Sequence, residues 1–456
     1  MGRVLGGSFE AADVLAIPWH NFIFRPQLSV QSLVTDNVFY GNNGVTSPVV
    51  FRPIVLDTNT GTLKLGPATT NHVVLRSQES DVISYISPGL NLEYGLSGVN
   101  KLNFSYQLDE LFYLNHPTEN SEQHRFTVGF NYQSGAFSVK GKDSYGLLST
   151  PLGGGSYISL LSVVIDRRVW DDAYTFQVDV TEKSAIYTRV AHSALDYQYG
   201  LPIYDSDNLT GTVGWAYSPA ALLALTLESY YGQSALGSNL AALEKGPHSE
   251  LIGGSIGARG SFTPKIEGSA RFGVETRSLP GLVNGPSVIS PAVDLSLNYT
   301  MTPKTLGTLA FSRRTDISGY YSGQTLIANS VSLNLQQAVG SSGLWFVVGR
   351  AAGFLAEYSD VDLPVNVFAT DAAGNIRFDS FGRSISKSVM ANYGRSETTL
   401  SAGLQLLYQP RPWLQVSLAY DYTRYTPRFR DSRVDDSHPS IDYADNRATF
   451  RIGIGF

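Results

Sequence analysis

Residues 450–456 read Phe-Arg-Ile-Gly-Ile-Gly-Phe, so apolar side chains alternate with small or polar ones up to Phe456. Successive side chains of a β-strand point to opposite faces, and this period of two therefore predicts a strand with one apolar face. The same alternation occurs just upstream, in residues 398–409 and 414–423. The end of the chain is thus expected to consist of strands that are apolar on one face only.

This alternation also recurs far upstream, in residues 102–109, 126–132, 209–217 and 293–299. Tyrosines lie where several of the apolar faces end, as expected of the aromatic girdles at the two interfaces of a membrane. In residues 304–315 and 343–358 the pattern leaves open which face is apolar. The repeated pattern predicts many strands whose apolar faces contact lipid and whose polar faces line a lumen.

The composition agrees with a membrane protein that crosses the bilayer as strands. Aromatic residues make up 12% of the chain, whereas charged residues make up only 16%, well below the roughly 25% of an ordinary soluble domain. Mean hydropathy is −0.06, and no apolar run approaches the 18 or so residues that a membrane-spanning helix needs. A helical membrane protein is therefore excluded.

Connections of two lengths alternate along the chain. Eight are short and rich in turn-forming residues, and nine longer ones lie between them, which implies about 18 strands. The short ones are at 95–99, 133–135, 181–183, 218–220, 263–265, 302–304, 340–343 and 409–412. The longer ones are near 35–80, 113–122, 149–165, 198–204, 233–247, 278–286, 316–324, 359–392 and 427–442.

These patterns predict an all-β fold, a transmembrane antiparallel up-and-down β-barrel of about 18 strands formed by residues 22–456. Both termini would be periplasmic, with the short turns in the periplasm and the long loops outside. Residues 1–21 show no period and would form an N-terminal segment in the periplasm or the lumen. The first residues lack the apolar core of a signal peptide, so we expect that a leader peptide is absent from this sequence.

Charged side chains on the polar faces are the candidate lumen lining. They could act in selecting what passes, or they could pair across strands and only support the wall. Glu267, Arg271, Glu275 and Arg277 form the densest group and are the best candidates for a constriction. The full set is Asp109, Arg125, Lys140, Asp179, Arg189, Arg259, Glu267, Arg271, Glu275, Arg277, Asp294, Asp421 and Arg451.

The sequence offers no signature of catalysis, metal binding or nucleic-acid binding. His192 and Ser193 are the nearest approach to a catalytic pair, but adjacent strand residues point to opposite faces. The acidic pairs Asp205 with Asp207 and Asp360 with Asp362 supply too few oxygens for a calcium loop. The net charge of −6 is scattered, without a basic run, and cysteine is absent. We therefore predict no enzyme, cofactor, metal or nucleic-acid partner.

Two stretches near the start resemble a known family. Thr35-Asp-Asn-Val-Phe-Tyr40 and Ser80-Asp-Val-Ile-Ser-Tyr-Ile-Ser-Pro-Gly-Leu-Asn-Leu-Glu-Tyr94 resemble the opening of the beta-barrel porin 2 group, over residues 22–145. That group includes outer-membrane barrels linked to exopolysaccharide export. The resemblance implies a Gram-negative outer-membrane barrel that passes an exopolysaccharide or another saccharide, with a periplasmic polysaccharide-export component as partner.

Two other functions fit the same pattern. One is a general diffusion porin for small solutes, and the other is a plugged structural or adhesive barrel whose outer loops bind a ligand. Any of the three would contact outer-membrane lipid and lipopolysaccharide. The barrel-assembly machinery is a further expected partner, because the chain ends in a motif similar to the terminal-aromatic assembly signal of bacterial barrels, with Phe450, Ile452, Ile454 and Phe456 in the apolar places.

Overall fold

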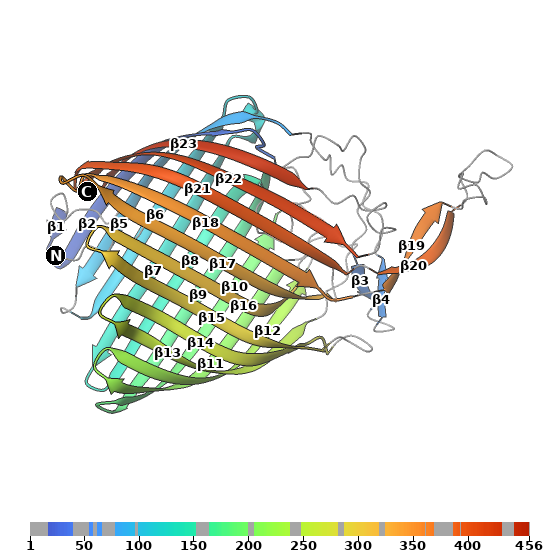
Figure 1. The fold of residues 1–456 in the computed structure, drawn as a ribbon, viewed down its shortest axis with the longest axis horizontal. Coiled ribbons are helices and arrows are strands. Elements are labelled where there is room, and N and C mark those ends of the chain that lie inside the picture. Colours follow the sequence, from blue (N-terminus) through green and yellow to red (C-terminus); the bar gives the residue numbers. More distant parts are fainter. Residues whose placement is uncertain are drawn as a thin grey trace.

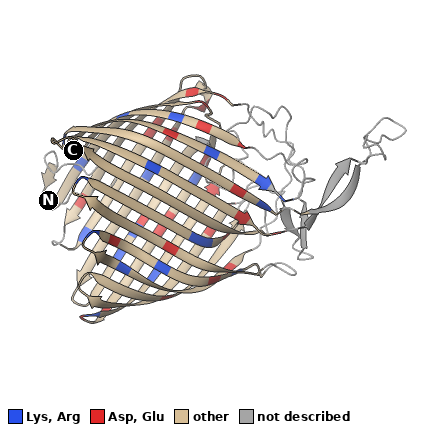
Figure 2. Cartoon of the chain, in the orientation of Figure 1, with Lys and Arg blue, Asp and Glu red and all other residues tan. Residues whose placement is uncertain are grey.

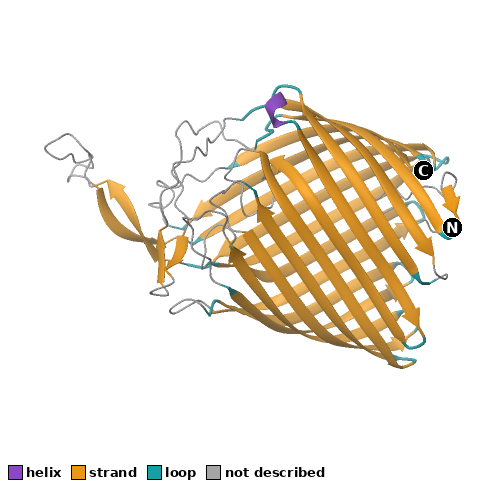
Figure 3. Ribbon diagram, turned by 180° about the vertical axis from the view of Figure 1, so that it is seen from behind, coloured by secondary structure: helices purple, strands orange, loops and turns teal. Residues whose placement is uncertain are grey.

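The computed structural model describes most of the chain. The described residues are 17–39, 54–57, 62–65, 78–95, 99–151, 164–198, 205–237, 248–280, 287–318, 324–360, 362–368, 386–392, 394–430 and 442–455. They are almost entirely strands, and the η2 helix (Pro117–Glu119) is a single 3-10 turn (Figure 3). No helix among the described residues is long and apolar enough to cross a membrane.

Eighteen long strands form the body of the molecule. They are β2 (Phe22–Thr35), β5 (Asp81–Gly95), β6 (Lys101–Tyr113), β7 (Ser121–Ser134), β8 (Phe137–Pro151), β9 (Val164–Thr181), β10 (Ser184–Tyr197), β11 (Asp205–Ala220), β12 (Leu223–Gly237), β13 (Ser249–Thr263), β14 (Ile266–Ser278), β15 (Ser287–Thr302), β16 (Thr305–Ile317), β17 (Thr325–Val339), β18 (Trp345–Tyr358), β21 (Arg395–Arg411), β22 (Leu414–Phe429) and β23 (Tyr443–Gly455).

Each long strand pairs antiparallel with the next long strand along the chain. The ring closes because β23 pairs with β2, from Gln27 opposite Gly455 to Thr35 opposite Arg447. A closed ring leaves no unpaired sheet edge. The prediction of an 18-stranded antiparallel up-and-down barrel is confirmed, and the strands tilt around the barrel as closure requires (Figure 1).

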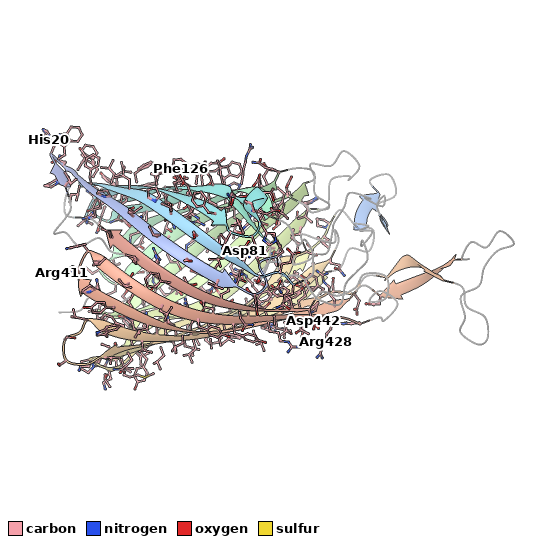
Figure 4. The ribbon with its side chains drawn as sticks, turned by 90° about the horizontal axis from the view of Figure 1, so that it is seen from above. His20, Asp81, Phe126, Arg411, Arg428 and Asp442 are labelled. Atoms are coloured by element: carbon pink, nitrogen blue, oxygen red, sulfur yellow. The ribbon has the colours of Figure 1, made fainter. Side chains whose placement is uncertain are left out.

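The two ends of the barrel differ in their connections. All eight predicted short turns lie at one end, called the short-turn end here, where β2 begins and β23 ends (Figure 1). The nine longer connections lie at the other end, the long-loop end. In Figure 4, Arg411 marks the short-turn end, and Arg428 and Asp442 lie toward the long-loop end. The periplasmic position of the termini stays a prediction.

Three short elements accompany the ring. Strand β1 (Ile17–Trp19) pairs with the start of β2, so part of the N-terminal segment is sheet, and residues 1–16 lie outside the described residues. Within the long connections, β3 (Ile54–Asp57) pairs with β4 (Thr62–Leu65), and β19 (Asp362–Phe368) pairs with β20 (Ser386–Asn392). Neither hairpin joins the barrel sheet.

Contacts between strands that are not neighbours identify the inner face of the barrel. Tyr187 on β10 reaches Glu228 on β12, and Tyr230 on β12 reaches Glu275 on β14, each across an intervening strand. Side chains two strands apart converge only on the concave side of a curved sheet. The polar faces of the strands therefore point into the lumen.

The opposite, outer face is apolar and exposed. Leu28, Val30, Ile256, Phe272 and Leu404 are among many outward side chains between 38% and 64% exposed. Figure 4 shows Phe126 on the outside of the wall. Of the predicted assembly motif, Phe450, Ile452 and Ile454 share this outward face through their pairing with β22, whereas Phe456 lies outside the described residues. The two ambiguous segments are β16 and β18, whose Leu309 and Trp345 are outward and exposed.

A polar patch interrupts the outer face over β8 to β11. Asp143 and Asp172 lie opposite one another, and the register continues to His192. The patch is internally paired, since Tyr174 donates to Asp143 and His192 lies 3.2 Å from Asp172 and 3.3 Å from Asp207. His192 points outward and Ser193 inward, so the two do not cooperate as a catalytic pair.

Candidate pore lining

The strand register places all of the lumen residues predicted from sequence on the inward face. They lie on ten strands from β6 to β23: Asp109, Arg125, Lys140, Asp179, Arg189, Arg259, Glu267, Arg271, Glu275, Arg277, Asp294, Asp421 and Arg451. Figure 2 shows charged positions along the lengths of the strands as well as at their ends. Their role in selectivity stays a prediction.

The group on β14, predicted as a constriction, is spread along the depth of the barrel. Glu267 is one residue from the short-turn end of the strand, and Arg277 is one residue from its other end. Glu267 is exposed, whereas Glu275 and Arg277 are 4% and 5% exposed. Because one strand rises about 3.4 Å per residue, these four side chains belong to different levels of the lumen.

Two tyrosines lie flat against the wall over glycines of the neighbouring strand. Tyr187 crosses Gly214 of β11 and donates a 2.6 Å hydrogen bond to Glu228. A Cβ on Gly214 would lie 2.3 Å from the Tyr187 ring. Tyr230 crosses Gly253 of β13 in the same way, and a Cβ there would lie 2.3 Å from its ring. Glycine is needed at both places because only a hydrogen leaves room for the ring.

These tyrosines belong to a network of charges on β10 to β15. Arg271 donates a 3.2 Å hydrogen bond to Glu228 and lies 3.8 Å from Asp294. Arg259 lies over the Tyr187 ring, 5.7 Å from its centre. Glu228 is only 8% exposed, and buried carboxylates need such partners. The network therefore holds the side chains of this wall close to the sheet.

Strand β16 leans into the lumen at the long-loop end. Its pairing with β15 ends at Arg313, although it continues to pair with β17 up to Ile317. Beyond that point the Thr315 N–H donates to Glu275, and Arg277 donates a 3.2 Å hydrogen bond to the Thr315 carbonyl. Both partners are on β14, on the far side of β15. This end of the lumen is therefore narrowed by its own wall.

An ion pair is buried at the same end, on β21, three strands along the ring from β16. Arg395 and Glu397 of β21 are 2.9 Å apart, with each side chain 3% exposed. The Tyr358 hydroxyl donates a 3.1 Å hydrogen bond to Glu397, and the Arg395 guanidinium lies 4.2 Å from the centre of the Tyr358 ring. Of the predicted residues, Asp109 and Arg125 also form a close pair on this half of the barrel.

At the long-loop rim, His116 joins three segments that are distant in sequence. Its Nδ1 lies 2.7 Å from Asp81 and its Nε2 2.7 Å from Glu79, while Phe39 packs edge-on against the ring. Burial alone would lower the pKa of His116, but the hydrogen bonds with Asp81 and Glu79 outweigh it and raise the pKa. The contacts attach both ends of the first long connection to the rim.

No group of three or more potential metal ligands occurs among the described residues. The acidic loop residues weighed from sequence have other partners. Asp205 accepts a 2.8 Å hydrogen bond from the Tyr197 N–H, Asp207 lies beside His192, and Asp360 pairs with Arg430. Asp362 lies in β19, where nothing is described of the side chain.

Several charged inward side chains toward the short-turn end are open to solvent. Lys142, Arg259 and Glu267 are exposed. A recess of about 290 Å³ opens beside Lys142, with Ser144, Asp171, Asn208 and Thr210 in its lining. The barrel thus has a polar lumen that is open in its short-turn half and lined by buried side chains at the long-loop end.

The geometry defines the class, a closed 18-stranded antiparallel β-barrel with an apolar exterior and a charged interior. No family model matches the chain, and no curated protein matches it. The resemblance to the beta-barrel porin 2 group therefore stays a prediction.

The chain is similar at low identity to several solved structures, one of which is described as an outer membrane protein. The outer membrane protein opdK from Pseudomonas aeruginosa has 11% identity and a TM-score of 0.42, with 95% of this chain and 99% of that chain covered. OpdO from the same organism has 9% identity and a TM-score of 0.43, with 95% of this chain and 97% of that chain covered. The siderophore receptor PirA from Pseudomonas aeruginosa has 8% identity and a TM-score of 0.41, with 95% of this chain and 80% of that chain covered. Values this low transfer neither function nor residues.

Proposed function

We propose that the chain forms a conduit across the outer membrane of a Gram-negative bacterium, with a saccharide as its cargo. The observation that carries the proposal is the division of the wall into two faces. Exposed apolar side chains cover the outside of a closed ring, and charged and polar side chains line the inside. Such a surface is unfavourable in water and suits the hydrocarbon core of a bilayer.

Strand length and aromatic placement support the same proposal. The barrel strands have 13 to 18 residues, more than the 9–11 or so that a tilted strand needs to cross the hydrocarbon core. Trp345 and Tyr408 stack on the outer face near the short-turn end, with ring centres 4.3 Å apart. Aromatic rings of this kind favour the membrane interface. Closed barrels satisfy every backbone hydrogen bond within the wall.

The proposed cargo and partner rest on the porin 2 resemblance and on the chemistry of the lumen. Hydroxyl and amide side chains such as Ser144, Asn208 and Thr210 line the recess beside Lys142, and these groups hydrogen-bond to sugar hydroxyls. A periplasmic export component would meet the barrel at the short-turn end. A general diffusion porin would share this architecture without preference for a saccharide.

A plugged barrel is the second candidate, and a specific observation favours it. Four charged inward side chains at the long-loop end, Glu275, Arg277, Arg395 and Glu397, are each 5% exposed or less. A lumen filled at one end would pass little until a partner opened it.

Conductance in planar bilayers tests the conduit. The purified barrel is expected to give steady single-channel currents, which long saccharides reduce more than short ones because they occupy more of the lumen. Currents that no saccharide affects would favour a general diffusion porin. A folded sample without current would overturn the open conduit and favour the plugged barrel. Retention of heat-modifiable mobility on a gel confirms that each sample is folded.

A further inference from the structure

Basic side chains recur at one depth of the lumen. Lys142 follows the start of β8 at Phe137 by five residues, and Arg189 follows the start of β10 at Ser184 by five. Arg259 precedes the end of β13 at Thr263 by four. Six inward basic residues lie four or five positions from the short-turn end of their strands, and they are defined here as the basic belt: Lys142, Arg189, Arg259, Arg271, Arg350 and Arg451.

Equal counts place these side chains at a similar height. All of the strands begin or end at the short-turn end, and closure gives them a common tilt (Figure 1). Residues four or five positions from that end therefore lie at one level, and their inward side chains point toward a shared axis. The belt occupies β8, β10, β13, β14, β18 and β23, which surround the lumen.

Carboxylates balance only part of this charge. Glu228 lies five residues from the start of β12 and pairs with Arg271, and Asp421, seven from the start of β22, lies 3.1 Å from Arg350. Arg271 also lies 3.8 Å from Asp294, and Arg451 has an interaction of its own, so Lys142, Arg189 and Arg259 carry the charge that no ion pair among the described residues offsets. Asp171 lies farther in, ten residues from the short-turn end of β9.

Three members of the belt are available for a ligand. Within the described part of the chain, Lys142, Arg189 and Arg259 have no ion pair. Arg259 rests on the Tyr187 ring, which lies flat on the wall and leaves the guanidinium accessible. Lys142 stands at the edge of the polar recess, which also contains Asp171. A ring of accessible like charges in an aqueous lumen attracts counter-ions and repels co-ions.

We propose that the basic belt makes the lumen selective for anions and binds solutes that carry carboxylate or sulfate groups. The inference rests on the proposed conduit and defines its cargo as acidic. An acidic saccharide fits best, because the belt would pair with its carboxylates while the hydroxyl and amide groups of the recess form hydrogen bonds with its hydroxyls. Guanidinium groups bind carboxylates in a two-pronged geometry that a lysine cannot supply.

Ion selectivity in a salt gradient provides the first test. At about 0.1 M KCl, where the Debye length is about 10 Å, the wild-type channel is expected to favour chloride over potassium. The preference should weaken at about 1 M, where the Debye length is about 3 Å. The triple variant Lys142→Gln, Arg189→Gln, Arg259→Gln is expected to lose the preference. A cation-selective wild type, or an unchanged triple variant, would overturn the proposal.

The control removes the same charge outside the belt. Lys183, Lys265 and Lys304 lie in short turns at the rim, and their triple replacement by glutamine should leave the chloride preference largely intact. If this rim variant loses selectivity as fully as the belt variant does, the belt is not the source.

Equilibrium binding tests the belt even if the barrel passes no current. Hexagalacturonate, citrate and neutral maltohexaose are titrated into the folded protein by calorimetry. The Kd for hexagalacturonate should rise about tenfold in the belt triple variant, equivalent to about 1.4 kcal/mol, and stay near the wild-type value in the rim variant. Binding of citrate as well would show that small anions are also ligands. Equal affinity for hexagalacturonate and maltohexaose would overturn the belt proposal. If the barrel passes no current in bilayers but still binds hexagalacturonate through the belt, only the open conduit is overturned.

Discussion

Replacing Arg395 by methionine is expected to destabilise the folded barrel by about 3–5 kcal/mol, the usual cost of leaving one charge of a buried pair without its partner. The variant keeps an apolar side chain of similar length but leaves Glu397, 3% exposed, with tyrosine hydroxyls, from Tyr358 and Tyr425, in place of a cation. Denaturant unfolding of the barrel from lipid vesicles measures the change.

Two further variants separate charge from packing. Adding Glu397→Gln to Arg395→Met removes the uncompensated charge, and most of the lost stability should return. Arg430→Met breaks the pair with Asp360, whose side chains are 56% and 52% exposed, and should cost no more than about 1 kcal/mol. An Arg395→Met variant as stable as Arg430→Met would show that the pair is not buried in the folded protein.

Lysine in place of Ile256 is expected to cost about 2–4 kcal/mol, because a charge at the midplane of a bilayer loses its hydration. Ile256 is outward, 64% exposed and seven residues from either end of β13. In a barrel surrounded by water the same change would cost almost nothing. Unfolding from vesicles, with wild type as reference, supplies the free-energy difference.

A matched change at the rim serves as the control. Leu222 is 71% exposed in the short turn between β11 and β12, where a lysine reaches the aqueous phase, so Leu222→Lys should cost about 0–1 kcal/mol. Equal effects at Ile256 and Leu222 would contradict a hydrocarbon layer around the middle of the wall.

The fold could be predicted from the sequence because local signals repeat. In residues 414–423 each apolar side chain is followed by a polar or small one, and Thr-Pro-Lys marks the turns at 263–265 and 302–304. Period two determines the faces, and the alternation of short and long connections determines the strand count. The segments with undecided faces, β16 and β18, carry small or apolar residues on both sides, so their faces became clear only from pairing with their neighbours.

The candidate site was predictable only in part. Alternation places Arg189 and Arg259 on the polar face, but it does not say which inward residues share a level. The belt members Lys142 and Arg350 were missed for that reason, although counting residues from each short turn would have found them. Partners on other strands, such as Tyr187 for Glu228, depend on register. Two further features have no local signal in the sequence. One is the inward position of the end of β16, which reaches past β15 to β14, and the other is the outward orientation of Asp143 and Asp172.

The most direct test of the membrane-spanning barrel is label accessibility along one strand. The chain has no cysteine, so single cysteines at positions 331 to 336 of β17 can each carry a spin label without background. In lipid vesicles, labels at Val331, Leu333 and Leu335 are predicted to collide mainly with oxygen dissolved in the bilayer. Labels at Ser332, Asn334 and Gln336 should collide mainly with a water-soluble nickel chelate in the lumen. Uniform accessibility, or alternation of the opposite phase, would contradict a closed barrel with its apolar face in lipid and its charged face around water.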